Sequence, residues 1–210
     1  MLINDQPCLS LAARVREDDK VTVDGRTLQR QNDEVNILLY KPVGYLCSRN
    51  DPEGRPTIFE LLPPHLSRQR SIHYSGRLDF NSEGLIILTN SGAFTQKLSH
   101  PSEKTEKEYV VSVSKPFREE HAKSLISGVD IPSGFARATA VEKITKRSMA
   151  IVLEQGLKRQ IRYMLDALGY RVTRLVRVRI GNLTDTSLKP GHWRFLGRRD
   201  IASIFNETKH

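Results

Sequence analysis

The hydrophobic positions of this chain fall into short runs that predict strands. Runs of strand length lie at residues 36–40, 85–88, 107–113, 136–144, 148–154 and 170–180. The first two are nearly continuous apolar runs, as in buried strands, and the third and last alternate between apolar and polar side chains. The two runs on either side of Lys146-Arg147 are typical of a hairpin.

Other segments have the spacing of amphipathic helices. Residues 93–99 predict a short helix, and residues 117–127 predict a longer one that Gly128 can end. A third helix is predicted by apolar side chains three or four residues apart, at Ile161, Met164, Leu165 and Leu168. Gly169 is its natural C-terminal stop.

The stretch from His73 to Asn90 organises the middle of the chain. Its pattern is interrupted at Ser75-Gly76, a second turn covers residues 80–84, and a buried strand follows. Asp79 is therefore expected on a loop beside a rigid strand. Such a residue is either a turn-forming aspartate, which is common, or a reactive group directed at a substrate.

Composition and charge indicate which kinds of partner the protein can bind. The chain has 210 residues and a formal net charge of +9, with a pI near 9.7, so nucleic acid is the first candidate partner. An ordinary solvated basic surface is the alternative. Cys8 and Cys47 lie far apart, and the six histidines have no metal-binding spacing, so we expect a reducing, cytoplasmic environment and no metal. The longest apolar runs are well short of the ~20 residues that span a bilayer, so we expect no membrane contact.

Four ordered motifs resemble the RNA pseudouridine synthases of the small-subunit and large-subunit rRNA type. They are Lys41-Pro42-Val43-Gly44 after a strand, Gly76-Arg77-Leu78-Asp79 followed by Ser82-Glu83-Gly84-Leu85, Lys107-Glu108-Tyr109-Val110, and Gln155 to Leu165. A Pro-Gly-x-Trp-Arg element ending at Arg194 closes the resemblance. It implies an α+β fold, the pseudouridine synthase fold, with a mixed, mostly antiparallel sheet, flanking helices and an active cleft across the middle.

The resemblance also implies a domain organisation. Residues 1–33 are similar to the last part of an S4 RNA-binding domain, with strands near residues 2–4 and 20–23 but without the two helices that begin such a domain. Residues 34–200 would form the catalytic domain, and residues 201–210 a C-terminal tail.

Three residues are assigned catalytic roles by motif position. Asp79 would be the catalytic carboxylate, acting as the nucleophile or as the base that starts elimination at the sugar. Arg162 would pair with it and keep it ionised, although a solvated helix-face charge is the alternative. Tyr109 would stack on a flipped uridine, and its alternative is a strand tyrosine packed in the core.

Basic residues supply the predicted RNA contacts. Arg77 would occupy the space left by the extruded base, hold a phosphate, or only stabilise its turn, and Lys41 is either a phosphate contact or a solvated turn residue. Alternation along residues 170–180 predicts that three arginines share one strand face. The expected backbone contacts are Lys158, Arg159, Arg171, Arg177 and Arg179.

The resulting hypothesis is a site-specific rRNA pseudouridine synthase that needs no cofactor, since substrate and product are isomers. We expect a monomer that binds structured rRNA with a flipped uridine. The Gln155-Gly156-Leu157 element, with Gly169-Tyr170, is most similar to the large-subunit type, although Lys158 and Tyr163 depart from the family pattern. The alternatives are a tRNA pseudouridine synthase and a non-catalytic RNA-binding or ribosome-assembly protein.

Overall fold

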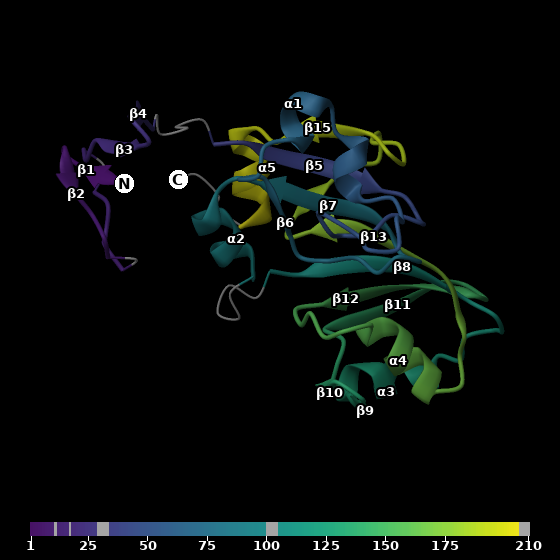
Figure 1. Ribbon diagram of the computed structural model, residues 1–210. Helices are drawn as coiled ribbons and strands as arrows, with labels where there is room; N and C mark the ends of the chain where they lie inside the picture. Colours follow the sequence, from purple (N-terminus) through teal and green to yellow (C-terminus); the bar gives the residue numbers. More distant parts are fainter. Residues whose placement is uncertain (11, 17, 29–33, 100–104, 206–210) are drawn as a thin grey trace. The chain divides into compact units, whose positions relative to one another are not determined.

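The computed structural model describes residues 1–10, 12–16, 18–28, 34–99 and 105–205 (Figure 1). The chain divides into two compact units, Met1–Glu34 and Val35–His210. Residues 29–33, at the end of the expected S4-like segment, and residues 206–210 of the expected tail lie outside the described residues.

The first unit is a small antiparallel sheet. Its strands are β1 (Leu2–Ile3), β2 (Gln6–Pro7), β3 (Val21–Val23) and β4 (Arg26–Thr27), in the order β2-β1-β3-β4. Asn4 ties its two hairpins together, because its side chain donates to Asp19 Oδ1 at 2.8 Å and accepts from the Lys20 amide at 2.9 Å. The strands predicted near residues 2–4 and 20–23 are confirmed.

The second unit is built on a nine-stranded sheet. Seven of its strands follow the order β11-β12-β8-β13-β7-β5-β15, and the other two, β14 and β6, pair with β13 and β7. The strands are β5 (Asn36–Lys41), β6 (His73–Ser75), β7 (Glu83–Thr89), β8 (Lys107–Val113), β11 (Ala140–Thr145), β12 (Ser148–Leu153), β13 (Val172–Ile180), β14 (Leu183–Thr184) and β15 (Trp193–Phe195). The pair β13–β7 is parallel, and the other neighbouring pairs of this sheet are antiparallel in the described residues. The mixed, mostly antiparallel sheet is therefore confirmed.

Helices cover both faces of this sheet. They are a 3-10 turn η1 (Ile58–Leu61), α1 (Pro64–Ser67), α2 (Gly92–Ser99), α3 (Glu120–Ser127), α4 (Gln160–Ala167) and α5 (Arg198–Ile204). In Figure 1, α3 and α4 lie beside β11 and β12, together with the short hairpin of β9 (Val129–Ile131) and β10 (Gly134–Ala136). These predicted helices exist because their apolar stripes face a sheet.

Three apolar clusters form the core. The first lies under α3 and α4 against β8, β12 and β13. The second joins β5 and β7 to η1, α1 and the segment before Asp79, and the third joins the other side of β5 and β7 to α2 and α5. Tyr109 packs against the first and second clusters, so it lies where the two halves of this unit meet.

Two predictions about the C-terminal third are wrong. The chain does not become a tail at residue 201, because α5 continues to Ile204, which is buried in the third cluster. The arginines of β13 do not share one face either. A shift of register places Arg177 opposite Tyr109 but Arg179 opposite Glu108, so the extra residue at this bulge turns the two arginines to opposite faces.

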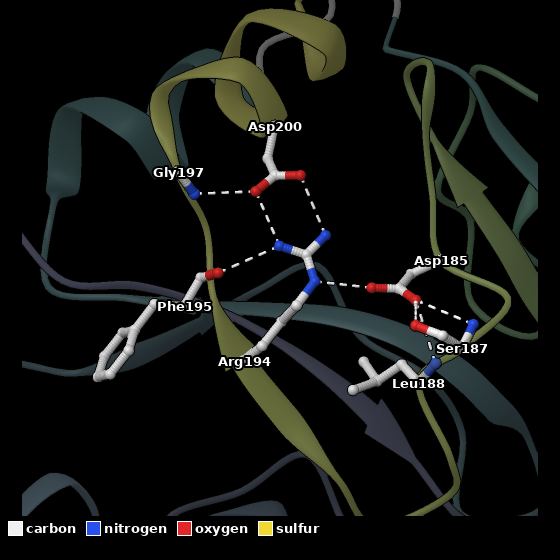
Figure 2. A network of polar contacts seen from close by, with 7 residues as sticks. All are labelled: Asp185, Ser187, Leu188, Arg194, Phe195, Gly197 and Asp200. Atoms are coloured by element: carbon white, nitrogen blue, oxygen red, sulfur yellow. Dashed lines mark hydrogen bonds and ion pairs between the residues drawn. The ribbon is translucent and has the colours of Figure 1, made fainter.

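A network around Arg194 anchors α5 to the sheet (Figure 2). The guanidinium donates to Asp185 Oδ2 at 2.7 Å and to the two oxygens of Asp200 at 2.8 and 3.0 Å. Asp185 also accepts bonds from Ser187 and from the Leu188 amide, and Asp200 accepts the Gly197 amide that begins α5. Arg194, taken from the sequence as the end of a motif, thus has a structural role.

Candidate active site

The loop that carries Asp79 connects β6 to β7. Gly76 opens it with φ +74°, a left-handed conformation that favours glycine. Gly84 closes it with φ +112°, and a Cβ there would lie 2.2 Å from the Arg177 carbonyl oxygen. The close approach of β7 and β13 therefore requires glycine at residue 84, and it brings β13 directly beside the loop.

Lys41 holds this loop from beneath. Its side chain is 0% exposed, and its Nζ donates to the carbonyl oxygens of Ser82 at 2.7 Å, Pro42 at 3.0 Å and Phe80 at 3.5 Å. Burial lowers the pKa of Lys41 to about 8. The prediction of a phosphate contact or a solvated turn residue is wrong, because the buried ammonium donates to backbone carbonyls, two of which, at Phe80 and Ser82, belong to the loop that carries Asp79.

Asp79 and Arg162 come together from segments about eighty residues apart. Arg162 Nε lies 4.0 Å from Asp79 Oδ2, and the two side chains are 16% and 39% exposed. Arg162 Nη2 also donates to the Asn81 carbonyl oxygen at 2.7 Å and contacts Ser82 Oγ at 3.3 Å. Arg162 therefore lies beside Asp79 as predicted, and its other two contacts, at Asn81 and Ser82, fix the loop itself.

The start of α4 sets the position of Arg162. Gln160 is buried, and its side chain accepts the Leu157 amide at 3.1 Å and donates to Gln155 Oε1 at 3.0 Å. Arg159 precedes the helix in a left-handed conformation with φ +52°. Burial lowers the pKa of the Arg162 guanidinium and Asp79 opposes that shift, yet the group stays charged at neutral pH.

Tyr109 and Arg177 form the adjacent part of the sheet. They are paired across β8 and β13, and Tyr109 is partly buried between two core clusters. Arg177 is only 4% exposed, and its Nε donates to the Leu85 carbonyl oxygen at 2.6 Å. The prediction that Arg177 contacts an RNA phosphate at the surface is wrong, because the side chain is folded inward over β7.

The remaining predicted RNA contacts divide into exposed and neutralised residues. Arg77, Lys158, Arg159 and Arg171 are exposed. Arg179 is instead partly buried, with Glu106 at 3.0 Å and Glu108 at 2.7 Å, so its charge is already paired and the predicted phosphate contact is wrong.

Arg171 lies away from Asp79. It lines a pocket of about 490 Å³ with Arg147, Ser114 and Thr145, beyond the end of β8 that is remote from Lys107. Six residues of extended chain separate it from Arg177, or roughly 20 Å. The structure therefore brings Asp79, Arg162, Tyr109 and Arg177 together, and leaves Arg171 outside that group.

Two residues of this site were missed as individuals. Ser82 is buried and links Arg162 to Lys41 through its hydroxyl and its carbonyl. Lys107 shares the Tyr109 face of β8, and burial, then the charge of Arg177, lower its pKa to about 8. Both occur inside the motifs, so the motif was visible although the side-chain contact was not.

Comparison with known proteins decides the family. Residues 35–167 match the model of the RNA pseudouridylate synthase family. The chain belongs to the RNA pseudouridine synthase family. Members of this family are isomerases, and the α+β fold described above is theirs.

Individual family members agree with this assignment. The chain is 36% identical over 209 residues to ribosomal large subunit pseudouridine synthase B of Pseudomonas aeruginosa, covering 95% of this chain and 54% of the relative. It is 31% identical to ribosomal small subunit pseudouridine synthase A of Escherichia coli, covering 92% and 84%. A crystal structure of a pseudouridylate synthase superposes with a TM-score of 0.77 at 26% identity, covering 97% and 87%. The chain thus spans about half the length of the large-subunit relative.

The described residues show neither a metal site nor a membrane-spanning helix. No group of three or more His, Cys, Asp or Glu side chains is arranged to hold a metal ion. No helix there is both long and apolar enough to cross a membrane.

Proposed function

We propose that this pseudouridine synthase isomerises a uridine of ribosomal RNA, with Asp79 as the catalytic carboxylate. The observation that carries the proposal is the meeting of Asp79 with Arg162 on an exposed loop. The carboxylate is 39% exposed and keeps its oxygens open to a ligand, while the guanidinium beside it supplies a positive charge.

The reaction follows from what such a carboxylate can do. Asp79 either attacks ribose C1′ and forms an ester, or removes the C2′ proton, and in both routes the N1–C1′ bond breaks and its electrons leave with the uracil. The uracil turns and its C5 bonds to C1′. Asp79 is then released from the ester, or returns the proton to C2′. The C5 proton leaves and N1 takes up a proton, so the product is an isomer of the substrate.

The neighbouring residues provide for the nucleotide. Tyr109 offers a ring face from the central sheet, against which an extruded base can stack. Arg77 is exposed two residues before Asp79, where it can hold a phosphate or take the place of the extruded base. Lys158 and Arg159, at the start of α4, are the further candidates for backbone contacts.

We favour the large-subunit rRNA as substrate, because the similarity to the large-subunit relative, at 36%, exceeds that to the small-subunit relative, at 31%. The Gln155-Gly156-Leu157 element supports the same choice. The partner would be a folded RNA element with an unstacked uridine, selected by shape and by its 2′-hydroxyls.

Tritium release tests the proposal. Unmodified transcripts of bacterial large-subunit and small-subunit rRNA carry tritium at uracil C5, and the label leaves only when C5 becomes bonded to the sugar. We expect release from the large-subunit transcript and far less from the small-subunit transcript and from tRNA. RNA that binds tightly but keeps all its label would favour the alternative, an RNA-binding or ribosome-assembly protein.

A further inference from the structure

Arg177 is a buried cation with an unused donor. Among the buried side chains that the structure describes, its Nη2 is the only nitrogen without a hydrogen-bond partner. A charged donor left unpaired in the interior costs free energy of the order of a few kcal/mol. Nε is bonded to the Leu85 carbonyl oxygen, which fixes the guanidinium and leaves the buried Nη2 unpaired.

Two buried lysines lie near Arg177. Lys41 and Lys107 are close enough for Arg177 to lower the pKa of each, although burial is the larger cause in both cases. The other arginines of β13 are different, because Arg174 is 2.7 Å from Glu83 and Arg179 has two glutamates. The Lys41 ammonium already donates hydrogen bonds to three backbone carbonyl oxygens. Arg177 is therefore the cation of this strand with capacity for a negatively charged ligand.

Arg177 also lies close to the proposed base-stacking residue and to the loop that carries Asp79. It is paired with Tyr109 across the β8–β13 ladder and so shares its face of the sheet. A Cβ on Gly76, three residues before Asp79, would lie 3.9 Å from Arg177 Nη1. The guanidinium is thus enclosed between the proposed base-stacking residue and the turn that leads to the proposed catalytic carboxylate.

We infer that Arg177 stabilises the negative charge of the uracil while the base is detached from the sugar. When the N1–C1′ bond breaks, the electron pair stays with N1 and spreads to O2 and O4, and the Nη2 donor binds one of these oxygens. The charge disappears again when C5 bonds to C1′ and loses its proton while N1 gains one. This inference rests on the proposed function and adds a catalytic residue to it.

A backbone phosphate is a poorer ligand for this group. Phosphate contacts are made at the surface, where the RNA backbone passes, whereas Arg177 is 4% exposed. The edge of a base is flat and narrower than a phosphodiester with two attached sugars, so it suits a donor that lies below the surface better than a phosphate does. A preorganised buried donor of this kind is also most effective against charge that develops during the reaction.

A leaving-group experiment tests the inference. The large-subunit rRNA transcript is prepared with uridine or 5-fluorouridine at the modified site, and consumption of that nucleoside is followed in single turnovers by digestion and mass spectrometry. Fluorine withdraws electrons and stabilises the detached base by itself. We expect Arg177→Met to lose about 100-fold in rate on uridine and less than about 10-fold on 5-fluorouridine, with RNA affinity within about three-fold.

Two companion variants separate catalysis from folding. Arg174→Met removes an exposed arginine from the other face of the same strand and should match the wild type on both RNAs. Arg177→Lys keeps the positive charge but lacks the planar set of guanidinium donors. We expect it to lose less rate than Arg177→Met, with the same dependence on fluorine, and it keeps the test usable if the methionine variant does not fold. Equal losses on the two RNAs, or no loss, would overturn the inference. A wild-type protein that consumes neither nucleoside would instead overturn the proposed function, and this inference with it.

Discussion

Arg162 and Arg194 are both partly buried arginines that face aspartates. They differ in how many oxygens of the facing carboxylates are already bonded to protein groups. Around Arg194, four carboxylate oxygens of Asp185 and Asp200 are all engaged, by the guanidinium and by nearby backbone and hydroxyl groups. In the described part of the chain, the Asp79 carboxylate has one ion-pair partner, Arg162, at 4.0 Å. A saturated pair is typical of a structural joint, and an unsaturated one leaves oxygens available for chemistry.

The largest expected effect follows from removing the open carboxylate. Asp79→Asn should reduce turnover by at least about 10⁴-fold, because the amide can neither attack C1′ nor take a proton. RNA affinity should stay within a few-fold, and the free energy of unfolding within about 0.5 kcal/mol. Tritium release, RNA binding and urea unfolding measure the three quantities. Asp166→Asn, an equal charge change at an exposed position of α4, is the control, and turnover retained by the Asp79 variant would refute its assignment.

Arg162→Met should have the next largest effect, again on rate. We expect kcat to fall by about 10²-fold to 10³-fold, since the carboxylate loses its counter-charge and the loop loses its bonds at Asn81 and Ser82. The protein should lose only about 1 kcal/mol of stability. Lys123→Met removes one positive charge from an exposed position of α3 and should leave kcat unchanged. A variant that is strongly destabilised but retains the kcat of the wild type while folded would show that Arg162 has a structural role, like Arg194.

Arg194→Met should reverse this pattern. It leaves two aspartates without their shared cation, so the free energy of unfolding should fall by about 2–3 kcal/mol while kcat of the folded protein is unchanged. Urea unfolding followed by circular dichroism gives the first value. The control Arg118→Met breaks an exposed pair with Glu120 and should cost less than about 0.5 kcal/mol. A loss of kcat without a loss of stability would contradict the structural role.

Acid should weaken the same network by a smaller amount. Hydrogen bonds from Arg194 lower the pKa of Asp200, and for Asp185 burial raises the pKa but bonds from Arg194 and Ser187 outweigh it. Because these folded-state pKa values lie below those of the unfolded chain, the stability they contribute is present above about pH 4 and is lost as the pH falls further. The difference in unfolding free energy between wild type and Arg194→Met should shrink by about 1 kcal/mol from pH 6 to pH 3. An unchanged difference would show that these carboxylates do not titrate with the pair.

Much of the fold was predictable, because most of its elements carry a clear period. The strands near residues 36–40, 85–88 and 107–113 and the helix that contains Arg162 lie where the apolar pattern placed them. Hydrophobic periodicity could not predict that Arg162 lies beside Asp79. That contact was predicted only because two motifs resembled those of one family.

The errors share a physical cause, which is that they depend on partners distant in the sequence. Lys41 precedes a proline and a glycine, as an exposed turn residue would, and its burial depends on hydrogen bonds to the distant carbonyls of Phe80 and Ser82. The alternation of residues 176–180 continues through the bulge, so only the pairing with β8 reveals that Arg177 and Arg179 face opposite ways. Short apolar stretches such as residues 201–205 carry too little pattern to distinguish a helix from a tail.

The central place of β13 affects how the chain acquires its structure during synthesis. This strand separates β7 from β8 and pairs with both, yet it follows both of them in the sequence. A nascent chain that ends near residue 167 already contains Asp79, Tyr109 and Arg162, but it presents two unpaired strand edges in place of a finished sheet. Such a chain would need protection from aggregation until β13 emerges, and a gene fragment cut at the same point should yield insoluble protein.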